Sequence, residues 1–116
     1  MSEKQKLLIV DDSELNRDIL KEILGSSYDY LEAENGNQAI QILEVHPEID
    51  LMLLDINMPQ MNGFQVLEHM RELQWIDEVP VVMISSEESV EIMRKAYDLG
   101  ITDYISRPFD AVIVKK

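Results

Sequence analysis

The sequence predicts an α/β domain in which parallel strands alternate with helices. Short apolar runs, of the kind buried on both faces of a parallel sheet, recur along the chain, and segments with apolar residues at helical spacing separate them. Each intervening segment is long enough to carry the chain back to the sheet edge where the previous strand began, which favours parallel strands. With 116 residues and 46% hydrophobic content, the chain has the size and apolar content of one domain, residues 1–116.

The first strand and the first helix are clearly marked. Residues 6–11 form an apolar run that ends in a carboxylate, as expected of a strand inside a parallel sheet. Beyond it, Ser13 is a suitable N-cap and Gly25 a suitable C-terminal stop, so we expect a helix between them. The apolar residues at helical spacing in this segment are Leu15, Ile19, Leu20, Ile23 and Leu24.

The same alternation continues along the rest of the chain. We expect strands at 30–33, 49–55, 79–84 and 102–106, and helices at 38–45, 64–73 and about 87–99. The residues after Pro108 allow only about two helical turns, where a helix that covers a sheet usually has about three or more. We therefore expect the chain to stop inside a fifth helix, with an output domain following in the natural protein.

Composition excludes several classes of protein. The 10 basic and 23 acidic residues give a net charge of -13, which repels nucleic-acid phosphates, so we expect no direct nucleic-acid binding. No cysteine is present, which excludes a disulfide framework and a thiolate zinc site. No apolar run approaches the length of a membrane span, so we expect no membrane segment, and a reducing, cytoplasmic location fits best.

Polar residues gather where the predicted strands end. In an open parallel sheet these carboxyl ends lie at one rim, where ligands bind. The residues at this rim are Asp11, Asp12, Asp55, Ser85, Ser86, Ser106 and Arg107. The strand assignments therefore bring carboxylates, hydroxyls and a cation together.

The three aspartates of this rim indicate a metal site. Clustered carboxylates raise one another's pKa unless a cation joins them. The ligand atoms are all oxygens, with no His or Cys beside them, which suits Mg²⁺ or Mn²⁺. A carboxylate held against such a cation beside Arg107 and Ser85 is equipped to attack a phosphoryl group, with Asp55 as the nucleophile.

The motifs of the chain, taken in order, resemble those of a known family. They are Asp11-Asp12, Asp55-Ile56-Asn57-Met58-Pro59, Gly63, Ser85, Tyr104 and Pro108-Phe109. In this order and spacing they resemble the receiver domains of two-component response regulators, of the chemotaxis-regulator type, over essentially the whole chain. The resemblance implies a flavodoxin-like, doubly wound sheet with strand order 2-1-3-4-5 and helices on both faces.

The resemblance also implies a role for each site residue. Asp55 would accept a phosphoryl group from a histidine kinase or a phosphotransfer protein. Asp12 and Asp55 would bind Mg²⁺ together with the backbone carbonyl of Asn57. Asp11 would act mainly through a metal-bound water.

A switch is a further implication of the resemblance. Ser85 would bind a phosphoryl oxygen in the active state, and Tyr104 would turn inward behind it. These changes would reach the face formed by the helix at 87–99, the strand at 102–106 and the fifth helix, where an output domain, a partner protein or a second copy would bind. Such a domain assists its own phosphorylation and dephosphorylation and is not an enzyme that acts on another substrate.

Two residues depart from the family pattern, and they keep other functions open. Arg107 stands where the family has Lys, and Ser86 where it usually has Ala or Gly. Arg107 is compatible with a receiver-like interaction module that takes no phosphate. A phosphohydrolase with an aspartyl nucleophile is a weaker alternative, because Asn57 stands where such enzymes commonly carry a second acid. The acidic loop after the first strand disfavours a flavin phosphate site.

Structural interpretations of the same residues also stay open. Ser85 could cap a helix within the capping-box sequence Ser85-Ser86-Glu87-Glu88, and Asp12 or Ser13 could cap the first helix. Tyr104 could serve packing alone.

Overall fold

The structure is a computed structural model that describes residues 4–58, 61–85 and 89–106. The strands are β1 (Gln5–Val10), β2 (Tyr28–Ala33), β3 (Leu51–Asp55), β4 (Val81–Ser85) and β5 (Asp103–Ser106). The helices between them are α1 (Glu14–Leu24), α2 (Gly36–Val45), α3 (Gly63–Glu72) and α4 (Val90–Asp98). These elements appear in the predicted order, whereas Arg107 and the predicted fifth helix lie outside the described residues. None of the described helices has the length and apolar character needed to cross a membrane.

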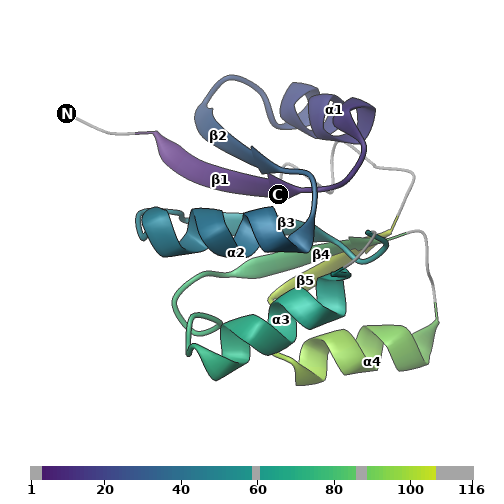
Figure 1. Cartoon of the computed structure of the whole chain (residues 1–116). Helices are drawn as coiled ribbons and strands as arrows, with labels where there is room; N and C mark the ends of the chain where they lie inside the picture. Colours follow the sequence, from purple (N-terminus) through teal and green to yellow (C-terminus); the bar gives the residue numbers. More distant parts are fainter. Residues whose placement is uncertain (1–3, 59–60, 86–88, 107–116) are drawn as a thin grey trace.

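The strands form one parallel sheet in the order β2-β1-β3-β4-β5, with every neighbouring pair parallel (Figure 1). This confirms the predicted α/β fold and its strand order. The chain leaves β1 towards β2 on one side and returns to β3 on the other, so the direction of winding reverses between β1 and β3. Such a switch point leaves a crevice at the carboxyl ends of the two strands, and in open α/β sheets ligands bind there.

The hydrophobic core lies on both faces of the sheet. Successive side chains of a strand point to opposite faces, so Leu8 and Val10 of β1 join one cluster and Ile9 between them joins the other. The larger cluster includes Leu67 of α3 together with residues of α2 and α4, and the smaller one is closed by Leu20 of α1. Helices therefore cover both faces, with α1 on one and α2, α3 and α4 on the other (Figure 1).

Helix α1 begins and ends where the sequence predicts. The Ser13 hydroxyl accepts a hydrogen bond from the Asn16 N–H at 3.3 Å, which confirms Ser13 as the N-cap. Gly25 ends the helix with a φ of 91°, a conformation that glycine adopts without steric cost. The apolar repeat is less fully buried than its spacing suggests, because Leu15 is 68% exposed and only Leu20 is fully buried.

Helix α4 begins later than predicted. The expected start lies near residue 87, but the helix starts at Val90, where the Ser89 hydroxyl accepts from the Ile92 N–H at 3.5 Å. Ser85 is the last residue of β4 and is fully buried, so the alternative interpretation of Ser85 as the cap of this helix is wrong. The serines and glutamates between β4 and α4 offer several possible caps, and local sequence alone does not choose among them.

Candidate functional site

Three carboxylates meet at the carboxyl ends of β1 and β3. Asp11 and Asp12 follow β1, Asp55 is the last residue of β3, and one oxygen from each lies within 4.8 Å of the others. The two strands are neighbours in parallel register, with Val10 opposite Leu54, which places the next residue of each strand at the same rim. The predicted convergence of the aspartates is therefore confirmed.

The cluster combines two buried carboxylates with an exposed one. Asp11 is 1% exposed and Asp55 2%, whereas Asp12 faces solvent. Burying two carboxylates side by side is costly because each loses water and repels the other. A divalent cation would remove both penalties, and a set of carboxylate oxygens with one solvent-exposed member fits Mg²⁺ or Mn²⁺, which retain water ligands.

Local hydrogen bonds fix the loop after β1. The Ser13 N–H donates to Asp11 Oδ1 at 2.9 Å, and the Asp11 N–H donates to the Ala33 carbonyl of β2 at 3.0 Å. On the other side of the residue, Arg17 Nη1 of α1 donates to the Asp11 carbonyl at 2.7 Å. Asp11 is thus held through its carboxylate and through both of its backbone polar groups.

Asp55 is held by the loop that follows it and by the start of α3. The Asn57 N–H donates to Asp55 Oδ1 at 3.3 Å, and the Asn57 side chain is exposed. Gly63 opens α3 so close to β3 that a Cβ atom there would lie 2.6 Å from the Asp55 carbonyl oxygen. Only glycine permits this approach, because non-bonded carbon and oxygen atoms are not found at that distance.

Ser85 and Tyr104 lie on the β4 and β5 side of the rim. Ser85 ends β4 and pairs with Ser106, while Tyr104 pairs with Met83 two residues earlier in the ladder. Tyr104 and Met83 belong to the cluster beneath α2, α3 and α4, and strand alternation directs Ser85 to the same face. Both predicted residues therefore lie where the sequence places them, whereas Arg107 and Ser86 lie outside the described residues.

Arg17 and its partner Glu32 also belong to this region, although no sequence motif indicated them. Arg17 lies one turn into α1 and turns back to β1, while Glu32 of β2 accepts from Arg17 Nε at 3.0 Å. The available signal was a basic residue four positions after the N-cap Ser13, on the helix that follows the acidic loop. That signal is weak, because most arginines in such positions face solvent.

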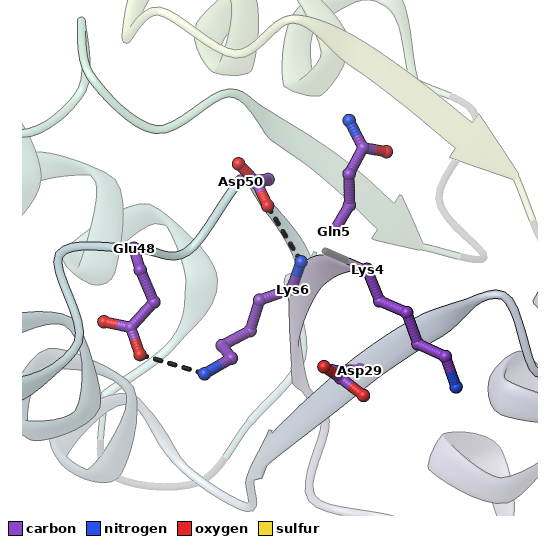
Figure 2. A pocket seen from close by; sticks show the side chains of 6 residues that line it. All are labelled: Lys4, Gln5, Lys6, Asp29, Glu48 and Asp50. Carbon is purple, nitrogen blue, oxygen red and sulfur yellow. Dashed lines mark hydrogen bonds and ion pairs between the residues drawn. The ribbon is translucent and has the colours of Figure 1, made fainter. Parts of the chain in front are cut away.

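A second polar region lies at the opposite end of the sheet. Lys6 of β1 has its Nζ 2.9 Å from Glu48 Oε2, and its backbone N–H donates to Asp50 Oδ2 at 2.8 Å. Both contacts are drawn as dashed lines in Figure 2. His46 Nδ1, at the end of α2, lies 2.8 Å from the same Glu48 oxygen. Hydrogen bonds from His46 and Lys6 lower the pKa of Glu48 to about 2. These paired charges join β1 to the loop before β3 and lie far from the acidic rim.

Comparison with known proteins identifies the family. The sequence model of the response regulator receiver domain matches residues 7–115. The fold, the strand order and the acidic cluster agree with this match. The chain belongs to the response regulator receiver domain family of two-component systems.

Individual relatives cover most of the chain. The chemotaxis protein CheY1 of Helicobacter pylori is 34% identical over 113 residues, which are 96% of this chain and 91% of that protein. A probable cyclic di-GMP phosphodiesterase of Vibrio cholerae is 33% identical over 109 residues, 94% of this chain and 24% of that protein. A solved CheX-CheY-BeF3-Mg²⁺ complex from Borrelia burgdorferi superposes with a TM-score of 0.86 at 30% identity, over 95% of this chain and 83% of that one.

Proposed function

We propose that this domain is a signalling switch in which Asp55 accepts a phosphoryl group from a histidine kinase or a phosphotransfer protein. The observation that carries the proposal is the meeting of Asp11, Asp12 and Asp55 at the switch point of a receiver fold. An oxygen of the Asp55 carboxylate forms the new bond to phosphorus as the bond between phosphorus and the donor nitrogen breaks. The donor imidazole keeps that electron pair and leaves.

The proposal includes a divalent cation, Mg²⁺ or Mn²⁺, in the acidic cluster. Asp12, Asp55 and the backbone carbonyl of Asn57 bind it directly, and Asp11 acts through a water molecule. The all-oxygen donor set and the exposure of Asp12 support this assignment. So does the complex of the Borrelia relative, whose description includes Mg²⁺. When bound, the cation supplies charge that offsets the negative oxygens of the transferring group.

The switch itself uses Ser85 and Tyr104. A phosphoryl group adds about 1.5 to 2 negative charges and strong acceptor oxygens, and the Ser85 hydroxyl donates to one of them. In the proposed active state Tyr104 is held inward behind Ser85, which sets the face formed by α4, β5 and the predicted fifth helix. Ser85 is buried at the rim, and Tyr104 already occupies an inward position on the same face of the sheet, so the phosphoryl group would stabilise this position of Tyr104.

An output domain or a partner protein binds this face and responds to the change in it. The Vibrio relative supports an output domain in the same chain, because the matched region is only 24% of that protein. The Borrelia relative supports a separate partner, because it is described in complex with CheX.

Intact mass measurement tests the acceptor. The domain is incubated with a small phosphodonor such as acetyl phosphate, with Mg²⁺ or with EDTA, and the wild type should gain one phosphoryl group only when Mg²⁺ is present. Asp55→Asn should gain none. Asp29→Asn, an exposed carboxylate of β2 at the opposite end of the sheet, is the matched control and should behave like wild type. A mass gain that persists in Asp55→Asn would contradict the assignment.

A receiver-like module that takes no phosphate is the second candidate, favoured by Arg107 in the position where the family has Lys. It predicts no mass gain of the wild type with any donor, while the fold and partner binding are retained. The same experiment therefore separates the two functions.

A further inference from the structure

Arg17 connects the acidic loop to the edge of the sheet. From α1 its guanidinium donates from Nη1 to the Asp11 carbonyl at 2.7 Å and from Nε to Glu32 Oε1 of β2 at 3.0 Å. The side chain is only 12% exposed, so the two bonds are largely shielded from competing water. A planar guanidinium with donors in a fixed fork sets the relative position of two acceptors in a way that a single ammonium does not.

Glu32 is a firm anchor for this contact. Its second oxygen, Oε2, accepts from Lys21 Nζ at 3.0 Å, and its strand is in register with β1, with Glu32 opposite Ile9. Partial burial opposes ionisation of Glu32, but the hydrogen bonds from Lys21 and Arg17 outweigh it and lower the pKa of this carboxyl. Glu32 is therefore charged at neutral pH and cannot easily turn away from Arg17.

The carbonyl that Arg17 binds belongs to the peptide between Asp11 and Asp12. Rotation of that peptide would turn the Asp12 carboxylate relative to Asp55, because Asp12 follows the peptide directly. The Asp11 N–H donates to β2, and the Asp11 carboxylate accepts from the Ser13 N–H. The bond from Arg17 fixes the Asp11 carbonyl as well, so it restrains rotation of the peptide.

We propose that Arg17, anchored by Glu32, is a positioning residue that holds the Asp11-Asp12 peptide in the orientation in which the acidic cluster binds a divalent cation. The inference rests on the proposed function only in requiring that the cluster takes such a cation.

The charge and the position of Arg17 have opposite effects on cation binding, which makes the inference testable. As a cation near the cluster, Arg17 repels Mg²⁺, so a purely electrostatic role predicts tighter binding when it is removed. As a positioning residue it strengthens binding, and losing a residue that orients metal ligands typically weakens metal affinity by about 10-fold to 100-fold.

Isothermal titration of the unphosphorylated domain with Mg²⁺ decides between these roles. We expect Arg17→Ala to bind Mg²⁺ about tenfold more weakly than wild type, or weaker still. Lys21→Ala is the matched comparison, because it removes a neighbouring cation and one of the two partners of Glu32 but leaves the bond from Arg17 to Asp11 in place. That variant should therefore lose clearly less Mg²⁺ affinity than Arg17→Ala.

A second pair of variants keeps the test valid if Arg17→Ala is poorly folded. Glu32→Gln and Glu32→Ala remove the same charge, but only Gln keeps an oxygen that can accept from Arg17 Nε. Glu32→Ala should therefore bind Mg²⁺ several-fold more weakly than Glu32→Gln. Equal affinities within this pair, or an Arg17→Ala variant that is folded and binds as tightly as wild type, would overturn the inference. A wild type that binds no Mg²⁺ would overturn the proposed metal site as well, so the two failures are distinct.

Discussion

At the scale of single residues, the rim sets two buried carboxylates beside an exposed one. Asp11 and Asp55 are almost completely shielded from solvent, whereas Asp12 is exposed to it. Electrostatic interactions are stronger where water is excluded, so a cation or a cationic side chain near Asp55 acts more strongly than it would at the surface. The exposed Asp12 leaves a route from solvent to the cluster. This division suits the proposed function, in which the site admits both an ion and a phosphodonor.

Arg107 is the residue whose chemistry departs most from the family. Its charge can pair with Asp55 or with the phosphoryl group, but a guanidinium needs more room than an ammonium and a forked partner. We therefore expect Arg107→Lys to be phosphorylated at least as fast as wild type. Arg107→Ala should lose most of the phosphorylation or its coupling to Ser85 and Tyr104.

The rate of mass gain with acetyl phosphate and the affinity for a partner, measured for both Arg107 variants, check this expectation. If the alanine variant matched wild type in both assays, the site would have to work without that cation.

At the scale of elements, α4 is joined to α3 by weak contacts. Lys95 Nζ lies 4.4 Å from the centre of the Phe64 ring, and Arg71 Nη1 donates to the Asp98 carbonyl at 3.4 Å. A cation-π pair whose cation is exposed contributes about 0.5 to 1 kcal/mol. In the proposed switch a shift of α4 would therefore lose little at these two contacts, whereas the apolar side of α4 also packs in the larger core cluster.

The start of α4 depends on one cap. Replacing Ser89 with Ala removes the hydroxyl that accepts from the Ile92 N–H, and should lower the free energy of unfolding by about 1 kcal/mol. Urea unfolding measures the loss. Ser26→Ala, an exposed turn serine, is the control and should change stability by less than about 0.5 kcal/mol. Equal losses in the two variants would mean that Ser89 does not cap the helix.

At the scale of the whole molecule, the charged contacts at the amino ends of the strands give stability a defined dependence on pH. The pKa of Glu48 falls from 4.5 to about 2 on folding. Its contribution is therefore fully present above pH 4.5 and is lost as the pH falls towards 2. Because Glu48 is exposed, salt should weaken the contribution as well.

Urea unfolding of Glu48→Gln at several pH values tests this contribution. The difference in stability from wild type should be at its full size above pH 4.5 and should disappear towards pH 2. Glu44→Gln, an exposed glutamate of α2, is the matched control and should show no such dependence. A Glu48→Gln difference that stayed constant across this range would rule out the ion pairs as its cause.

The order of the elements was predictable because each strand is a short apolar run bounded by polar residues. Their ends were less predictable. The strand expected at 49–55 begins at Leu51, because the Ile49 N–H bonds to the His46 carbonyl and closes a turn. The strand expected at 79–84 begins at Val81, after Pro80, which has no N–H to give to a ladder.

The candidate site was predictable only where it follows from the sheet. Asp11, Asp12 and Asp55 follow strands, and parallel strands bring their ends together whatever the side chains nearby. The contact between Arg17 and Asp11 depends instead on how α1 lies against β1 and on which way a long side chain turns. Neither is encoded in local spacing, so this part of the site emerges only in three dimensions.

The approach of Gly63 to Asp55 has a consequence for how this domain can evolve. In the proposed function Asp55 is constrained through its carboxylate, whereas any side chain at position 63 would collide with the backbone of that same residue. Substitutions at 63 would therefore damage the site as substitutions at 55 would, although glycine offers the proposed reaction no functional group. A related domain that no longer carried out phosphotransfer would not need the carboxylate at position 55. It would still need glycine at position 63, because the collision is with the backbone and would disturb the fold. A divergent copy would thus lose its aspartate long before its glycine.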